Sequence, residues 1–216
     1  MGALGLTTIQ KIAIYAIPLI FAITLHEYAH GYIAYKNGDP TAKFLGRLTL
    51  NPLNHIDPIG TVLFPLISII LGNFIFGWAK PVPVNFANLR NPKRDMLWVS
   101  IAGPGANFAM ALIWALVLKF SFVISTGYFA QPLNLMAQAG ISLNIMLMLI
   151  NLVPILPLDG GRILFSLLPR AQAIKYSKIE PYGMWILILL ILTGALFTII
   201  QPFYSVITKI IFNLIM

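Results

Sequence analysis

Long apolar runs, separated by short polar connections, dominate this chain. A helix of about 20 apolar residues is long enough to cross the hydrocarbon core of a membrane. Runs of that kind lie at residues 12–36, 58–77, 97–125, 133–156 and 183–200, and residues 202–215 form a final amphipathic or membrane-dipping helix. The pattern therefore predicts an all-α membrane protein, a polytopic helical bundle of about 4–6 transmembrane segments.

The polar connections predict the remaining structure. The segment "NGDP" at 37–40 ends the first helix, because glycine and proline break helices. Residues 41–57 are interpreted as an interfacial loop with a strand or two, and the proline-rich residues 78–95 as a loop or re-entrant segment. The segment "GPGAN" at 103–107 is expected as a turn near the start of its span, and residues 161–180 as a short helix with a basic loop. The bundle should therefore carry a small interfacial or re-entrant extended/β segment.

Composition supports a multi-pass membrane protein. Of the 216 residues, 59% are hydrophobic and 9% are charged, whereas about a quarter of the residues in a soluble domain are charged. The chain has no cysteine, which excludes disulfide frameworks, thiolate zinc sites and cysteine nucleophiles.

The net charge of +8 raises the question of a nucleic-acid partner, and the distribution of the charges answers it. Eleven of the 14 basic residues lie in three connections: Lys36, Lys43 and Arg47; Lys80, Arg90, Lys93 and Arg94; Arg162, Arg170, Lys175 and Lys178. The positive-inside rule places such connections in the cytoplasm of a protein in the cell membrane. The positive charge is then explained by the orientation of the protein in the lipid bilayer, and no nucleic-acid partner is predicted. All three connections share one side only if residues 58–77, which Pro65 and Gly72 interrupt, form a broken hairpin rather than a full span.

The first apolar run contains three polar side chains in the segment "HEYAH": His26, Glu27 and His30. Burying such groups is costly unless each has a partner or a function. Residues four apart lie on one face of a helix, about 6 Å apart along its axis, so both imidazoles can reach one metal ion. Glu27 then lies beside the ion, where it can take a proton from zinc-bound water. The segment therefore predicts a Zn²⁺ site.

A zinc site with two histidines needs a third ligand and leaves a fourth position open. The candidates are His55 and the other acidic residues, Asp39, Asp57, Asp95, Asp159 and Glu180. Among them, Asp159 alone closes an apolar run, in "NLVPILPLDGGRIL". Asp159 is therefore favoured as the ligand, although a cap on a helix at 160–168 or a partner for Arg162 are alternatives.

Three elements of the chain resemble the site-2 protease family of intramembrane zinc metalloproteases, peptidase family M50. They are "HEYAH", "AGPGAN" at 102–107, and the pattern N-x-x-P-x-x-x-L-D-G from Asn151 to Gly160. The segments "GRLTLNPLNHIDPIGT" and "WAKPVPVN" are similar to the compact prokaryotic branch without a PDZ domain. The resemblance implies one transmembrane metalloprotease domain over residues 1–216, with a catalytic core at 12–168 and C-terminal helices at 181–215.

The resemblance also implies roles for individual residues. Asp159 would be the third zinc ligand and Glu27 the general base, while Asn151 would help to hold the substrate carbonyl or the oxyanion. The GPGAN turn, with Gly103 and Asn107, would lie beside the substrate-binding region. The implied reaction is hydrolysis of peptide bonds in or near transmembrane segments of membrane proteins, with the active site toward the cytoplasmic side.

Two further features concern the substrate. The extended segment "KPVPVNF" at 80–86 could pair with an unwound substrate through Val82 and Val84, but only along one edge, because its two prolines lack N–H groups. A covering loop is the alternative. His55, next to Asp57, is interpreted as an interfacial hydrogen-bonding residue, or else as a substrate contact or an alternative ligand.

Two other classes of function are open. One is a metal-ion transporter or channel, because intramembrane histidines and carboxylates also line ion paths. The other is a non-catalytic membrane scaffold. A transporter does not need the glutamate of H-E-x-x-H, and it usually shows inverted halves, which this chain lacks. We therefore predict an intramembrane zinc metalloendopeptidase, with a metal transporter or channel as the alternative. The sequence does not fix the substrate or the oligomeric state.

Overall fold

A computed structural model of the chain describes residues 7–57, 60, 63, 80–124 and 129–215. The described residues form an all-α bundle, as the apolar pattern predicts. Four of the described helices are long and apolar enough to cross a membrane: α1 (Thr8–Lys36), α4 (Pro92–Val123), α5 (Ala130–Asn151) and α9 (Ala195–Ile215). This agrees with the predicted bundle of transmembrane segments.

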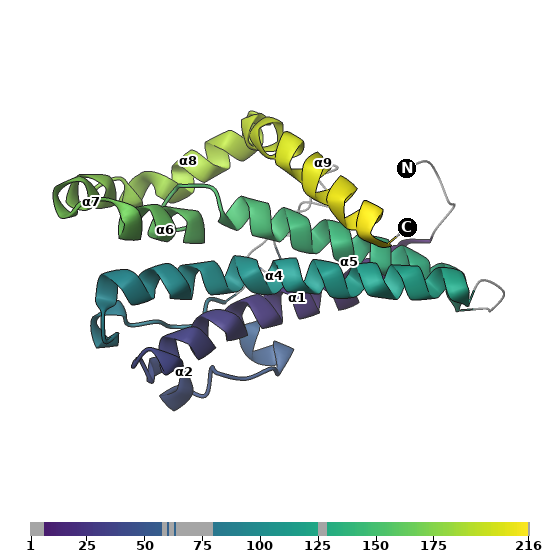
Figure 1. Cartoon of the computed structure of the whole chain (residues 1–216), viewed down its shortest axis with the longest axis horizontal. Helices are drawn as coiled ribbons and strands as arrows, with labels where there is room; N and C mark the ends of the chain where they lie inside the picture. Colours follow the sequence, from purple (N-terminus) through teal and green to yellow (C-terminus); the bar gives the residue numbers. More distant parts are fainter. Residues whose placement is uncertain (1–6, 58–59, 61–62, 64–79, 125–128, 216) are drawn as a thin grey trace.

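The helices α1, α4 and α5 lie side by side along the long axis of the molecule (Figure 1). Helix α4 packs against both α1 and α5, and α9 covers part of α4 and α5. The main core combines small and large side chains: Trp114 of α4 lies over Gly140 of α5, where a Cβ would collide with the indole. Ile141 and Ile145 of α5 and Ile211 of α9 complete this core.

Short elements connect the long helices. They are α2 (Thr41–Phe44), the 3-10 helices η1 (Pro52–His55) and η3 (Phe86–Asn88), α6 (Asp159–Leu167), α7 (Arg170–Ser177) and α8 (Glu180–Leu192). In Figure 1 the C-terminal end of α1, the N-terminal end of α4, α6 and α7 all gather at one end of the bundle. The side-by-side packing of the three long helices thus brings residues far apart in sequence to one place.

Two predicted features of the first half differ in the structure. Over 41–57 the chain forms α2 and η1, and no strand occurs among the described residues. The expected GPGAN turn is helical and lies inside α4, because glycine and proline are tolerated in transmembrane helices where neighbouring groups compensate the backbone. Most of 58–77 lies outside the described residues, so the choice between a hairpin and a full span stays a prediction.

Two further predictions were wrong in the C-terminal part. The basic loop within 161–180 is largely helical, since α7 fills it. The span expected at 183–200 is divided: α8 has only 13 residues, and the chain bends at Gly194, whose φ of 74° suits glycine. The membrane-spanning length belongs instead to α9, with 21 residues, so the expected short helix at 202–215 is part of it.

Candidate metal centre

His26 and His30 lie one turn apart on α1, and Asp159 reaches both from the first residue of α6. The Oδ2 atom of Asp159 is 3.3 Å from Nε2 of His26 and 3.2 Å from Nε2 of His30. The two Nε2 atoms are 3.0 Å apart, and both histidines are buried. The structure thus brings together the three residues that the sequence singled out as metal ligands.

The other ring nitrogen of each histidine faces a carbonyl oxygen. His26 Nδ1 lies 2.6 Å from the side-chain oxygen of Asn107, and His30 Nδ1 lies 2.7 Å from the backbone oxygen of Val99. Carbonyl oxygens only accept hydrogen bonds, so this network assigns the proton of each neutral ring to Nδ1 and a lone pair to Nε2. Both lone pairs point at Oδ2 of Asp159, a buried atom to which no group of the described chain donates a hydrogen bond. Three electron-pair donors therefore converge on one point, which is the arrangement that a cation stabilises.

The spacing of these donors fits zinc. Ligand atoms about 2.0–2.1 Å from a tetrahedral zinc ion lie about 3.3 Å from one another, and the observed separations are 3.0, 3.2 and 3.3 Å. Two histidines and one carboxylate, with a fourth position open, form a ligand set of hydrolytic zinc sites. Acceptors on both Nδ1 atoms are the partners that zinc-binding histidines usually have. His26, His30 and Asp159 therefore fit a zinc ion.

Helix α4 contacts both histidine rings at Gly103. A Cβ built on this residue would lie 2.6 Å from Cε1 of His26 and 2.6 Å from Cε1 of His30, too close for either ring to stay in place. The missing side chain lets α4 approach α1 closely enough for Val99 and Asn107, one turn to each side, to reach the Nδ1 atoms. Gly103 and Asn107 therefore contact the histidines, and their implied position beside the substrate stays a prediction.

The loop between α5 and α6 places Asp159. Helix α5 ends at Asn151, and the chain folds back so that Gly160 and Gly161 touch the loop backbone, with no room for a Cβ on either. Asp159 is the first residue of α6, and no side chain caps this helix. The capping alternative is therefore wrong. The alternative partner Arg162 instead pairs with Glu180, at 3.8 Å.

Glu27 lies outside the ligand cluster and binds the extended segment 80–85. Its Oε2 atom accepts a hydrogen bond of 2.7 Å from the backbone N–H of Val82. Val82 is buried and packs over Gly31, one turn further along α1. The N–H group that the sequence offered to a substrate strand is thus used within the chain, and it holds the carboxylate next to the histidines.

The segment 80–85 is tied to the end of α1 by Asp39. This carboxylate accepts hydrogen bonds from the backbone N–H of Asn85, at 2.7 Å, from the side chain of Asn88, at 3.0 Å, and from Thr41. Burial alone would raise the pKa of Asp39, but these hydrogen bonds outweigh it and lower the pKa. Asp39, which the sequence offered as a possible ligand, therefore anchors the segment that holds Glu27.

Three other residues from the sequence prediction lie outside the ligand cluster. His55 is buried, its Nε2 lies 2.9 Å from the backbone oxygen of Thr49, and its own backbone oxygen accepts from Lys80. Val84 packs against the small apolar cluster of Ala34, Leu89 and Val99. Asn151 is half-buried, and its side-chain nitrogen donates to the backbone oxygen of Leu147 at 3.0 Å. Their proposed contacts with substrate stay predictions.

Asn144 was not predicted as a site residue; it is fully buried on α5, and its side-chain oxygen accepts a hydrogen bond of 3.1 Å from the side-chain nitrogen of Asn107. The only signal was a lone asparagine within the apolar run "GISLNIMLML". Such a residue needs a hydrogen-bonding partner inside a membrane helix.

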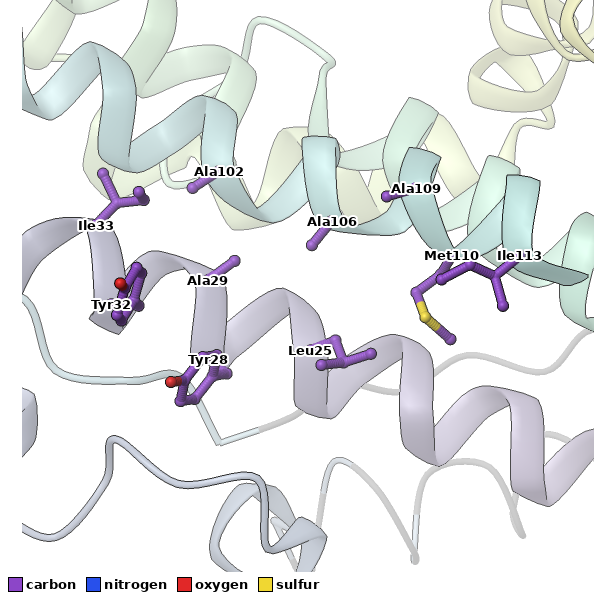
Figure 2. Close-up of a pocket in the computed structure, with 10 residues that line it drawn as sticks. All are labelled: Leu25, Tyr28, Ala29, Tyr32, Ile33, Ala102, Ala106, Ala109, Met110 and Ile113. Carbon is purple, nitrogen blue, oxygen red and sulfur yellow. The ribbon is translucent and has the colours of Figure 1, made fainter.

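An open apolar groove of about 450 Å³ lies between α1 and α4. Figure 2 shows Ala29 of α1 facing Ala102 and Ala106 of α4, with the tyrosines of α1 at one side and Met110 and Ile113 at its far end. Ala29 precedes His30, and Ala102 precedes Gly103. The groove is therefore formed by the same two helices that carry and support the histidine ligands.

Comparison with known proteins finds one family and several relatives. The model of peptidase family M50 matches residues 121–194. A protein of Bacillus subtilis named "Putative zinc metalloprotease YwhC" is 42% identical over 180 residues, which cover 82% of this chain and 79% of the relative. "Putative zinc metalloprotease Rip2" of Mycolicibacterium smegmatis is 30% identical, over 82% of this chain and 66% of the relative. "Zinc metalloprotease MJ0392" of Methanocaldococcus jannaschii is 28% identical, over 85% of this chain and 43% of the relative.

No solved structure shows significant similarity to the chain. The Bacillus subtilis relative matches most of both chains. The family model and the zinc-compatible arrangement of His26, His30 and Asp159 agree with this match. The chain therefore belongs to peptidase family M50 of zinc metalloproteases.

Proposed function

We propose that this zinc metalloprotease hydrolyses peptide bonds in or next to transmembrane segments of membrane proteins. The observation that carries the proposal is the depth of the ligands. His26 and His30 are buried on α1, a helix with the length and apolarity of a membrane span. A peptide can meet a site on this helix only where the peptide itself lies in or at the membrane.

The chain supplies the groups for hydrolysis. A zinc ion held by His26, His30 and Asp159 would lower the pKa of a coordinated water to about 7 and polarise a peptide carbonyl. Glu27 is held through Oε2 by Val82 N–H, and we assign to its Oε1 atom the role of accepting the proton of the attacking water. It then passes that proton to the amide nitrogen as the C–N bond breaks. The base is thereby fixed by the backbone rather than by a mobile side chain.

Asn151 is the proposed donor to the oxyanion. Its amide nitrogen carries two hydrogens, and in the described part of the chain one of them binds Leu147. The second hydrogen is available to a developing negative charge, an interaction whose loss elsewhere costs about 2.7–4 kcal/mol. In this role Asn151 keeps its hydrogen bond to Leu147.

The apolar groove between α1 and α4 offers an apolar substrate segment a place beside the ligands. Its small side chains, Ala29, Ala102 and Ala106, allow close approach of another helix, as small residues do at helix contacts in membranes. The unwound part of the substrate would then reach the cluster near Glu27. Pairing with segment 80–85 would use Val84, because Val82 N–H is already bound to Glu27.

We place the active site toward the cytoplasm. The three basic connections meet at one end of the bundle: Arg90 N–H bonds to the backbone oxygen of Asn37, and Lys93 bonds to that of Leu168. This end holds the C-terminal part of α1, where the ligands lie (Figure 1). Under the positive-inside rule such an end faces the cytoplasm, and the protein would be a multi-pass protein of the cell membrane.

Zinc content and zinc transport separate this proposal from a metal transporter. Purified full-length protein in detergent should carry about one zinc per chain, and His26→Ala and Asp159→Ala should each lower that content. Glu27→Gln should keep its zinc and lose zinc-dependent cleavage of co-reconstituted single-span membrane proteins. Zinc flux into vesicles that contain the wild type, with no cleavage in any preparation, would contradict the proposal. Full zinc occupancy in Asp159→Ala would remove Asp159 from the ligand set.

A further inference from the structure

Two buried asparagines connect the candidate metal centre to the helices behind it. Asn107 of α4 and Asn144 of α5 are both 0% exposed. The side-chain oxygen of Asn107 lies 2.6 Å from His26 Nδ1, and its nitrogen donates to the backbone oxygen of Ala22, at 3.2 Å, and to the side-chain oxygen of Asn144, at 3.1 Å. The nitrogen of Asn144 donates to the backbone oxygen of Gly140, at 2.8 Å. One chain of hydrogen bonds therefore links α5, α4 and α1.

The backbone fixes the direction of every bond in this chain. Gly140 and Ala22 offer carbonyl oxygens, which can only accept, so the amide nitrogen of each asparagine must face them. The oxygen of Asn144 then points at Asn107, and the oxygen of Asn107 points at His26. His26 Nδ1 must be the protonated nitrogen, because its partner is an acceptor, and Nε2 keeps its lone pair. If the side-chain amide of either asparagine rotated by half a turn, its oxygen would face a backbone carbonyl oxygen, and two acceptors would lie face to face inside the bundle.

We propose that Asn107 and Asn144 are positioning residues that hold His26 in the tautomer and orientation needed to bind zinc. The inference rests on the zinc site proposed above. For His30 the acceptor on Nδ1 is the backbone oxygen of Val99, which no side-chain substitution removes. His26 differs because its second nitrogen depends on two side chains. The tautomer and orientation of the His26 ring therefore depend on how α4 and α5 pack against α1.

A purely structural role for the asparagines predicts a different set of effects. If they only join helices, any substitution at Asn107 should lower thermal stability and leave zinc affinity of the folded protein unchanged. If they position His26, affinity should follow the presence of an acceptor at residue 107. Asn107→Asp separates the two roles, since a carboxylate still accepts from His26 Nδ1 but cannot donate to Ala22 or Asn144.

Zinc affinity and stability are therefore measured on the same full-length proteins in detergent. Competition with a chelator gives the zinc dissociation constant, and thermal unfolding of the zinc-free protein gives its stability. Asn107→Leu should weaken zinc binding by about 10–100-fold, the usual effect of losing such a partner. Asn107→Asp should bind zinc at least as tightly as the wild type, although its zinc-free form should melt at a lower temperature. Asn144→Leu should weaken zinc binding by less than Asn107→Leu, because Ala22 still orients Asn107.

Asn134→Leu is the matched control. Asn134 also lies on α5 and also bonds to α4, through Ser121 at 3.2 Å, but it makes no contact with the ligands. It should lower stability and leave zinc affinity unchanged. Equal zinc affinity in Asn107→Leu and the wild type would overturn the inference, and so would equal losses in Asn107→Leu and Asn107→Asp. If Asn107→Leu does not fold, unchanged affinity in Asn144→Leu overturns it. A wild type that binds no zinc would instead contradict the proposed function.

Discussion

Gly103→Ala tests how closely the geometry of the centre depends on one missing side chain. The added Cβ would lie 2.6 Å from Cε1 of both His26 and His30, whereas non-bonded carbon atoms lie about 3.5–4.0 Å apart. The rings, or the backbone of α4, must therefore move by about 1 Å. Ligand atoms in a metal site tolerate deviations of about 0.2 Å, so this movement should disrupt the ligand set.

The effect on stability should be smaller than the effect on zinc. Alanine is favoured over glycine in a helix by about 1 kcal/mol, and crowding a packed site costs about 1–3 kcal/mol. The two largely offset each other, so the free energy of unfolding of the zinc-free protein should fall by about 0–2 kcal/mol. Cleavage per folded molecule should fall about 100-fold or more, as expected for a displacement of about 1 Å.

Gly105→Ala is the control, because this residue is exposed on the same helix and a Cβ there meets nothing within 4 Å. It should keep zinc and activity and be neutral or slightly stabilising. Both variants are compared by zinc content after dialysis against a weak chelator, by thermal unfolding in detergent and by cleavage rate. A Gly103→Ala protein with the zinc content and turnover of the wild type would refute the reasoning.

Three further predictions concern other parts of the account. Asn151→Ala should keep its zinc and lose about 10²–10³ in cleavage rate if the side chain donates to the oxyanion; normal turnover in stable, zinc-loaded protein would end that assignment. Lys43→Cys, Arg90→Cys and Lys175→Cys replace exposed residues, and each should react with a membrane-impermeant thiol reagent from the cytoplasmic side only; labelling of the first two from opposite sides would show that residues 58–77 span fully. The lowered pKa of Asp39 means that its ionised form stabilises the fold above the unfolded-state pKa of about 3.9, and that this contribution is lost as pH falls through the lower folded-state pKa. Asp39→Asn should therefore melt below the wild type at pH 7 and approach it below about pH 4, and a constant difference across that range would contradict the assignment.

The sequence predicted those parts of the site that depend on local spacing. His26 and His30 are four residues apart on a strongly apolar helix, so their shared face followed from helical geometry alone. Asp159 was identifiable because it is an acidic residue at the end of an apolar run. The long helices α1, α4 and α5 followed from run length for the same reason, since hydrophobic length sets what can cross a membrane.

The features that were not predicted correctly from the sequence depend on tertiary contacts. Val82 and Glu27 are 55 residues apart, and no local pattern pairs them. The segment GPGAN lies inside α4, where Gly103 packs against His26 and His30 of α1, and no local pattern reveals that contact. The bend between α8 and α9 requires a positive φ at Gly194, and one glycine in an apolar run does not reveal which conformation it adopts.

The position of the cuts tests the central claim most directly. Membranes from cells that express the wild type or Glu27→Gln are compared by mass spectrometry of the new termini of membrane-protein fragments. The account predicts termini within or immediately beside transmembrane segments that occur with the wild type and are absent with Glu27→Gln. Identical termini in the two samples, or wild-type termini confined to soluble domains far from the membrane, would contradict it.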